Sequence, residues 1–537
     1  MNPHACTKRA GRLLMALAAA TSILLMGACG SGNPITVPNP QGFNNGSLKG
    51  TYVFSSAGSD ANQNPLALAG AFTADGNGGI NPGTIDVVDP VITPIPSPVA
   101  QSISSSSSYR VSTDGRGQAT LISSYGTFVL DFVLTSSLHG LVTEHDSNGT
   151  GSGTLDMQTA LTSLSQLAGP YAFSFAGIDS GDNSFATAGA FVLNSSGVVT
   201  AGEGVEDFND GGVPELDQSL TSDTATLGSG TGPGSITLTT ESHALTYDFY
   251  PIDPTHIKFI ETDYAEFLSG DAFTQSGASI PANTTMVFTM AGGTSGPIAD
   301  GGVMTSVDGL GDFSGGLEDI NNVGVPVTQV PFSGVAGGVA GVGGRVVVNL
   351  TGFTPSVDNS AQWVIYPFSG GVLLLESDSA TVTSGAAYAQ SATSFTAPAG
   401  YGLNLSGING GGEVDDIAQF DATTAVAPAT NMTGTLDDNV QGSVDSGSLS
   451  GSYAPGAPNS VVASAPKSYN TGFTLAYYVV NSSTAIFVDL DSIASGFPQA
   501  AVGTFEAQST PSSAAMAQSH IALVHAAARS HAALRRK

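Results

Sequence analysis

Gly50-Thr51-Tyr52-Val53-Phe54-Ser55-Ser56-Ala57-Gly58 begins a unit that occurs four times in the chain. The last glycine of this stretch recurs at intervals of 119, 115 and 115 residues, as Gly58, Gly177, Gly292 and Gly407. A large apolar side chain precedes each glycine at the position of Phe54: Phe54, Phe173, Phe288 and Leu403. Self-similarity at a constant period predicts tandem copies of one fold.

Two acidic residues separated by one position follow each glycine by 82 to 86 residues. These acid-x-Asp pairs are Glu144/Asp146, Glu261/Asp263, Glu376/Asp378 and Asp489/Asp491. A glutamine follows the first acid by fourteen residues in three units and by nineteen in the last: Gln158, Gln275, Gln390 and Gln508. The constant order of these residues supports four copies of one unit.

The first unit has the pattern of short strands joined by tight turns. Phe128, Leu130, Phe132 and Leu134 alternate with other residues, and Asp75-Gly76-Asn77-Gly78 is a typical hairpin turn. We expect strands at 50–56, 68–74, 80–88, 109–111, 118–123, 126–135, 140–145 and 151–158, with a loop over 89–107. About eight sequential antiparallel strands predict a small up-and-down barrel, because closure removes exposed edges. A two-sheet β-sandwich is the alternative.

The fold class is therefore all-β, and the chain divides into seven segments. We expect a signal peptide over 1–28, a flexible tether over 29–46, four β units over 47–160, 161–278, 279–394 and 395–510, and an Ala/His/Arg-rich tail over 511–537.

The N-terminal segment predicts export and lipidation. Lys8, Arg9 and Arg12 precede an apolar stretch over 13–26 that is too short to span a bilayer comfortably. Met26-Gly27-Ala28-Cys29 resembles the bacterial lipobox, although leucine is more usual than methionine at its first position. The resemblance implies that Cys29 carries acyl chains and anchors the protein in a membrane. Cleavage as an ordinary secretory signal is the alternative.

Charge and cysteine content exclude several classes of function. Residues 30–510 contain 43 acids and six Lys/Arg, a net charge of −37, so we expect no nucleic-acid partner. The only cysteines are Cys6, within the signal, and Cys29, so the mature chain has no disulfide.

The whole chain resembles multi-unit lipoproteins of acidobacterial type. The resemblance rests on Leu48-Lys49-Gly50-Thr51-Tyr52-Val53-Phe54, on 70–78 and on Gly151-Ser152-Gly153-Thr154-Leu155; the later units match less well. It implies an all-β repeat fold at the cell envelope and assigns no function.

We expect the acid-x-Asp pairs to be solvated strand ends that prevent edge-to-edge association. Ca²⁺ binding, together with Asp86, Glu206, Glu318 and Asp437, is the alternative, but the pattern does not supply six to eight converging oxygens. We therefore predict no metal site and no cofactor.

The sequence also predicts no catalytic site. The four histidines between residues 30 and 510, His139, His145, His243 and His256, all fall in the first two units, and no repeated nucleophile accompanies them. For the tail we weigh a helix that docks on the acidic units or on anionic lipid against a disordered end.

The expected function is non-enzymatic: a lipid-anchored protein of the cell envelope with a binding, adhesion or structural role. Gly30 follows Cys29 in place of the aspartate that retains many lipoproteins at the inner membrane, which favours the outer membrane. The expected partners are the membrane and a surface polysaccharide or protein. A small-ligand carrier or an enzyme using one barrel interior is the alternative, and a packed interior would argue against it.

Overall fold

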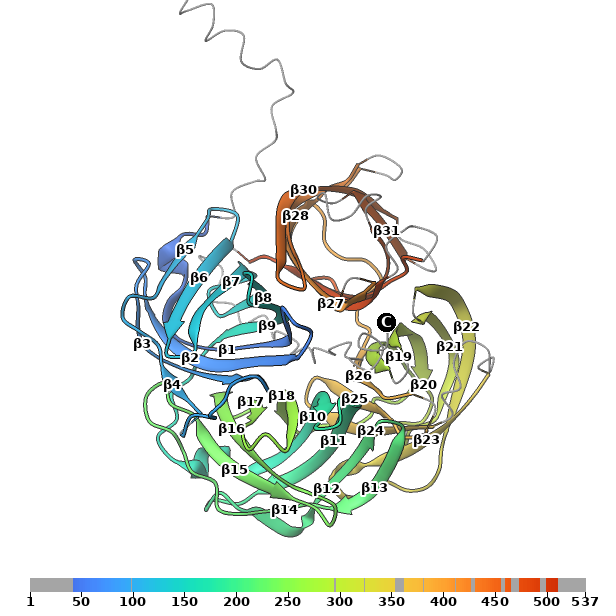
Figure 1. The fold of residues 1–537 in the computed structure, drawn as a ribbon. Coiled ribbons are helices and arrows are strands. Elements are labelled where there is room, and N and C mark those ends of the chain that lie inside the picture. Colours follow the sequence, from blue (N-terminus) through green and yellow to red (C-terminus); the bar gives the residue numbers. More distant parts are fainter. Residues whose placement is uncertain are drawn as a thin grey trace, which may run out of the picture. The chain divides into compact units, whose positions relative to one another are not determined.

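The computed structural model describes residues 42–97, 99–293, 296–322, 324–352, 362–379, 381–410, 412–425, 430–454, 459–464, 473–492 and 499–509. Over these residues the chain folds into antiparallel strands with three short 3-10 helices, and the strands belong to one compact body (Figure 1). Cys29, the predicted signal and the predicted tail lie outside the described residues.

Four units follow one another along the chain. Unit 1 contains η1(Asn45–Ser47), β1(Lys49–Asp60), β2(Pro65–Asp75), β3(Ile80–Val88), β4(Gln101–Ser102), β5(Ser108–Val111), β6(Arg116–Ser123), β7(Gly126–Leu134), β8(His139–His145) and β9(Gly149–Met157). Unit 2 contains η2(Leu164–Leu167), β10(Gly169–Asp179), β11(Ser184–Leu193), β12(Val199–Asp210), β13(Val213–Ser219), β14(Thr221–Ser222), β15(Gly234–Thr239), β16(Ala244–Asp253), β17(His256–Glu261) and β18(Glu266–Thr274).

Unit 3 contains β19(Thr284–Gly293), β20(Pro297–Ser306), β21(Phe313–Asn322), β22(Val325–Ala336), η3(Val342–Gly344), β23(Val346–Thr351), β24(Gln362–Phe368), β25(Gly371–Glu376) and β26(Thr383–Ala389). Unit 4 contains β27(Ala399–Asn409), β28(Gly412–Ala422), β29(Met432–Val440), β30(Ser443–Ala454), β31(Asn459–Ser464), β32(Phe473–Asn481), β33(Thr484–Asp489) and β34(Gln499–Ala507).

Every unit is an up-and-down meander in which the first long strand pairs with the last. Units 3 and 4 are closed eight-stranded barrels. Units 1 and 2 are nine-stranded sheets in which β1 pairs with β9 and β10 with β18, so the only interruption lies at the short β4 and β14. In unit 1 the backbone bonds from Ile80 to Ser107 and from Ser104 to Ile122 bridge that interruption. The prediction of four tandem antiparallel all-β units is confirmed, with the expected closed eight-stranded barrel in units 3 and 4 and a nine-stranded, nearly closed sheet in units 1 and 2. The sandwich alternative is wrong.

Side chains from alternate strand positions fill the inside of each unit. In unit 1 the ring of Phe54 lies over Gly70 on β2, where an added Cβ would come within 2.7 Å of the ring. Phe173 lies over Gly189 in the same way in unit 2. Separate buried clusters centred on Phe72, Phe259, Trp363 and Phe420 occupy units 1 to 4 in turn. The interiors are therefore packed with the units' own side chains.

One predicted boundary moves in the structure. Residues 29–46 were expected to form the tether, but Phe43 is buried in the core of unit 1 and its N–H bonds to the Thr113 carbonyl. Asn44 caps η1 with its side chain. The folded part of the chain therefore includes the last residues of the predicted tether.

Candidate functional site: the joints between units

Residues that recur in all units gather where one unit meets the next, and we call each such interface a joint. The outward faces of β2 and β11 carry alanines that alternate with the large interior side chains. At joint 1–2 three of these alanines form a buried cluster with residues of unit 2: Val53, Ala67, Ala69, Ala71 and Val88 with Tyr250, Ile252 and Ile260. Small outward side chains let two barrels approach closely.

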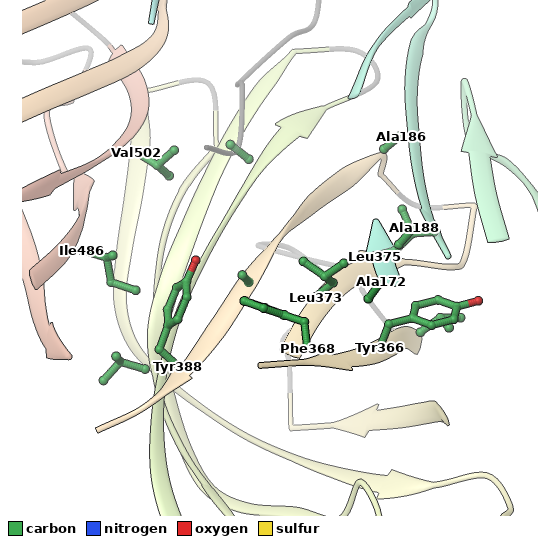
Figure 2. Close-up of a cluster of buried hydrophobic side chains, with 14 of the residues drawn as sticks. Ala172, Ala186, Ala188, Tyr366, Phe368, Leu373, Leu375, Tyr388, Ile486 and Val502 are labelled. Carbon is green, nitrogen blue, oxygen red and sulfur yellow. The ribbon is translucent and has the colours of Figure 1, made fainter. Parts of the chain in front are cut away.

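A larger buried cluster joins units 2, 3 and 4 (Figure 2). It runs from Ala172, Ala186 and Ala188 of unit 2 through Tyr366, Phe368, Leu373, Leu375 and Tyr388 of unit 3 to Ile486 and Val502 of unit 4. The ring centroids of Phe273 and Phe368, from units 2 and 3, lie 5.0 Å apart. Joint 4–1 has its own small cluster of Val133, Leu141 and Ile417.

A tyrosine of the following unit donates to a buried aspartate at three joints. Tyr250 Oη lies 2.6 Å from Asp86 Oδ2 at joint 1–2. Tyr366 donates to Asp207 at joint 2–3, and Tyr478 donates to Asp319 at joint 3–4. Asp207 is also held by Arg345, at 2.7 Å. At joint 4–1 the structural counterpart of these tyrosines is Val133.

Strand register corrects one comparison made from the sequence. Asp86, Glu206, Glu318 and Asp437 were expected to be equivalent because each follows a large apolar residue. Strand pairing instead makes four aspartates equivalent, each opposite the same position of the second strand of its unit. They are Asp86, Asp207, Asp319 and Asp437, which lie opposite Ala69, Ala188, Gly301 and Ile417. In units 2 and 3 the acid that follows the apolar residue, Glu206 or Glu318, lies opposite Gly189 or Gly302, as Ile85 lies opposite Gly70, so an alignment on the apolar residue is off by one position.

At three joints the side-chain amide of an asparagine in one unit donates to backbone carbonyls around the acid-x-Asp pair of the neighbouring unit. Asn439 Nδ2 donates to the backbone carbonyls of Glu144, Asp146 and Gly149 of unit 1, at 2.8, 3.3 and 2.7 Å. Asn209 and Asn321 make the equivalent triple contacts with the loops that contain Asp378 and Asp491. Val88 occupies this position in unit 1, so joint 1–2 lacks the amide.

The repeated glutamines bind the opposite end of the same joints. Each side-chain amide donates to a backbone carbonyl of the next unit: Gln158 to Pro251, Gln275 to Pro367, Gln390 to Val479 and Gln508 to Leu134. These four bonds measure 2.8, 2.7, 2.8 and 3.0 Å. Because unit 4 contacts unit 1 as each earlier unit contacts its successor, the four joints form a closed cycle.

The expectation that the acid-x-Asp pairs are solvated strand ends is wrong for the first acid of each pair. Glu144, Glu261, Glu376 and Asp489 are each at most 1% exposed. Burial, the largest cause, raises the pKa of Glu261 to about 10 and raises the pKa of Glu144 and of Asp489 well above their usual values. Burial therefore favours the neutral form of all three carboxyl groups.

The second acid of each pair has a local structural role. Its carboxylate accepts the backbone N–H of a residue 16 or 17 positions earlier: Asp146 from Val129, Asp263 from Thr246, Asp378 from Gln362 and Asp491 from Thr474. The donor residues lie at the start of the strand that precedes the pair. This repeated bond accounts for the conserved spacing within the chain without a metal ion.

A row of ion pairs crosses joint 4–1 and joint 1–2. His139 Nδ1 lies 2.6 Å from Asp156, and His139 Nε2 lies 3.1 Å from Glu506 of unit 4. Lys258 of unit 2, which is 2% exposed, lies 3.9 Å from Asp156 and 3.2 Å from Asp271. His256 also contacts Asp271, at 2.7 Å. The charges of units 4, 1 and 2 are thereby neutralised away from water.

These ion pairs are suited to holding units together rather than to proton transfer. Burial lowers the pKa of His139, but Glu506 and Asp156 outweigh it and raise that pKa to about 10. A general base at neutral pH needs a pKa near 7, so His139 is unsuited to that role.

Sequence reasoning singled out the acid-x-Asp pairs and the glutamines. It missed the three tyrosines that donate to buried aspartates and the three asparagines that donate to backbone carbonyls of the acid-x-Asp loops. The spacing of Tyr250, Tyr366 and Tyr478 near the unit length was the available signal. Their role depends on the neighbouring unit, which a period within one unit does not reveal.

Among the described residues, no group of three or more His, Cys, Asp or Glu side chains is arranged to hold a metal ion. Within the same part of the chain, no helix has the length and hydropathy needed to cross a bilayer. Comparisons with protein-family models, with curated proteins and with solved structures find no match.

Proposed function

We propose that this protein is a lipid-anchored, non-enzymatic component of the cell envelope, held in the outer membrane through Cys29, with a structural or binding role. The observation that carries the structural part is the packed interior of every unit. A carrier needs an interior space for its ligand, whereas Phe54, Tyr171, Trp363 and Phe420 are buried among other side chains of their own units.

The joints support the same proposal. The recurring polar residues are engaged in bonds between units, so the repeated chemistry of the chain serves assembly. A closed cycle of barrels can present the loops of all four units on one scaffold, as an adhesin or a structural spacer requires.

Membrane fractionation of a Cys29→Ser variant tests the anchor. The variant is expected in the soluble fraction, and the wild-type protein is expected to stay with membranes after a high-salt wash. Persistence of the Ser variant in washed membranes would contradict the anchor. Native mass spectrometry of the purified protein tests the carrier alternative, because a stoichiometric bound small molecule would contradict the structural role.

A further inference from the structure

The two ends of each unit differ in that only one of them contains the points where the chain enters and leaves the unit. The chain enters and leaves every unit at one end, which we call the entry end; in unit 1 it contains η1, the turns 76–79 and 112–115 and the start of β8. At each joint the glutamine at the end of one unit bonds to the entry end of the next, as Gln508 does with Asp114 and Leu134. The entry ends therefore adjoin one another around the cycle.

The entry end of unit 3 carries an exposed apolar patch. It consists of Val307, Leu310, Val335, Val339 and Val342, which are 41%, 65%, 57%, 97% and 40% exposed. Val307 and Leu310 come from the turn 307–312, Val335 from the end of β22, and Val339 and Val342 from the connection between β22 and β23. The N–H of Ala336 bonds to Asp312 at 2.8 Å, so the two segments lie together.

The turns of units 1 and 2 carry a polar residue where unit 3 has Leu310. In the turn after the second strand, Leu310 takes the place of Asn77 in unit 1 and Ser196 in unit 2, and in each the N–H at this position bonds to the side chain two residues earlier. Residues 334–344 contain only Gly, Val and Ala, whereas the equivalent turn 112–115 of unit 1 contains Asp114. The turn geometry does not require apolar residues, so their exposure in unit 3 needs another explanation.

Charged groups beside the patch are engaged elsewhere. The guanidinium of Arg345 lies 2.7 Å from Asp207 of unit 2. Asp312 accepts the N–H of Ala336, and Asp308, which is exposed at the edge of the patch, accepts the N–H of Leu310 at 2.8 Å. An apolar surface can cover the patch without removing an unpaired charge from water.

Both described ends of the chain emerge at entry ends. Phe43 bonds to Thr113, and Ser509 bonds to Thr135. Twelve residues lie between Cys29 and Gly42, and this segment can span roughly 45 Å when extended. The sequence after Ser509 contains four Lys/Arg and no acid, so it adds no negative charge at this end. The entry ends are therefore the ends nearest in sequence to the predicted anchor at Cys29 and to the basic tail.

We propose that the apolar patch of unit 3 inserts into the interfacial region of the bilayer and orients the protein on the membrane with its entry ends toward the lipid. This inference rests on the proposed lipid anchor, and it adds a second, non-covalent contact. The strongly acidic folded region makes zwitterionic lipid the favoured surface, because like charges repel at an anionic one.

A fluorescent probe that reports polarity tests the insertion. Val339→Cys is labelled in the lipidated full-length protein and reconstituted in phosphatidylcholine vesicles. The matched control is Val325→Cys, which is 56% exposed at the opposite end of unit 3. The Val339 probe is expected to shift to the blue on vesicles and to be quenched by lipid-borne quenchers, unlike the Val325 probe. Equal behaviour of the two probes on vesicles would overturn the proposal.

The same measurement without vesicles tests whether protein, rather than lipid, covers the patch. A blue shift at Val339 that grows with protein concentration would indicate a second copy of the chain, and one independent of concentration would indicate another segment of the same chain; either would overturn the proposal. As a second variant, Leu310→Asp with Val339→Asp is expected to speed transfer between vesicles about tenfold, because charge opposes burial in lipid. The control pair Val213→Asp with Val325→Asp is expected to leave the transfer rate unchanged.

Failure of the anchor and failure of the patch are distinguishable. Mass spectrometry of the mature N-terminus decides whether Cys29 is acylated. If it is not, the anchor fails, and the two labelled variants are compared by vesicle flotation. Binding with a blue shift only at Val339 would still support the patch, and absence of that difference would overturn it.

Discussion

The side-chain amide of Gln508, just after the last strand, donates to the backbone carbonyl of Leu134 in the first unit, 374 positions earlier, at 3.0 Å. The same amide also donates to the Asp114 carbonyl, at 2.7 Å. Equivalent bonds from Gln158, Gln275 and Gln390 connect consecutive units. The closing joint therefore uses the same contact as the joints between units that follow one another in the chain.

Removing this contact should weaken the closure. Gln508→Ala leaves two largely buried carbonyls without their donor, which is expected to cost about 1–3 kcal/mol in the free energy of unfolding. Urea unfolding followed by circular dichroism measures the loss. Gln218→Ala is the control, because that amide donates weakly within its own strand, to Leu216 at 3.4 Å. Equal unfolding midpoints for the two variants would contradict a role in closure.

The tyrosine at joint 2–3 should matter more than an exposed tyrosine. Tyr366→Phe removes the hydroxyl that donates to buried Asp207 and is expected to destabilise the chain by about 1–3 kcal/mol. Tyr453→Phe, whose hydroxyl bonds to the Thr423 carbonyl at an exposed site, is the control and should change stability by less. Thermal unfolding of both variants decides the question, and a larger effect at Tyr453 would count against the joint.

Asp86 and His139 are expected to make stability fall as pH rises from about 4 toward about 10. Burial, and next the charge of Asp248, raises the pKa of Asp86 from 3.8 to about 8. The folded state thus holds a proton that the unfolded chain has lost, so between these pH values each increase in pH disfavours folding. His139 acts in the same direction: its folded pKa of about 10 lies above its usual 6.5, so its contribution is complete below 6.5 and is lost as pH approaches 10.

Asp86→Asn tests the acid half of this argument. The amide does not ionise, so the variant should gain on the order of 1 kcal/mol or more relative to wild type when the pH rises from 5 to 9. Urea unfolding over this range measures the difference, with exposed Glu241→Gln as the control. A wild-type protein that becomes more stable toward pH 9 would refute the assignment.

Unit 1 alone, residues 42–160, is expected to fold because its interior cluster extends from Phe43 to Leu155 within that segment. It should melt at a lower temperature than the whole chain, because Val53, Ala67, Ala69 and Ala71 lose the cover of unit 2. Circular dichroism with heating measures both. Absence of a β-type spectrum would show that the joints are needed for folding, and equal melting temperatures would show that they add nothing.

Much of the fold could be read from local patterns. The alternation in β7 and the turn at Asp75 are short-range signals, and Ile80–Val88 is observed as the sequence predicts. The first acid of each acid-x-Asp pair was identified as a recurring residue but misread as solvated, because burial between units leaves no mark within one unit. Glu206 and Glu318 were likewise misaligned with Asp86, because strand pairing places them opposite Gly189 and Gly302, where Ile85 lies opposite Gly70.

The sequence by itself determined the repeat, the all-β class, the strand order within a unit and the residues that recur. These properties follow from side-chain periodicity and turn chemistry, which act over a few neighbouring positions. Only the tertiary structure decided that the units meet in a closed cycle, that Glu144 and its counterparts are buried, and that Gln508 reaches Leu134. Those outcomes depend on which surfaces pack together across hundreds of residues, and the free energy of that packing is not encoded in any single segment.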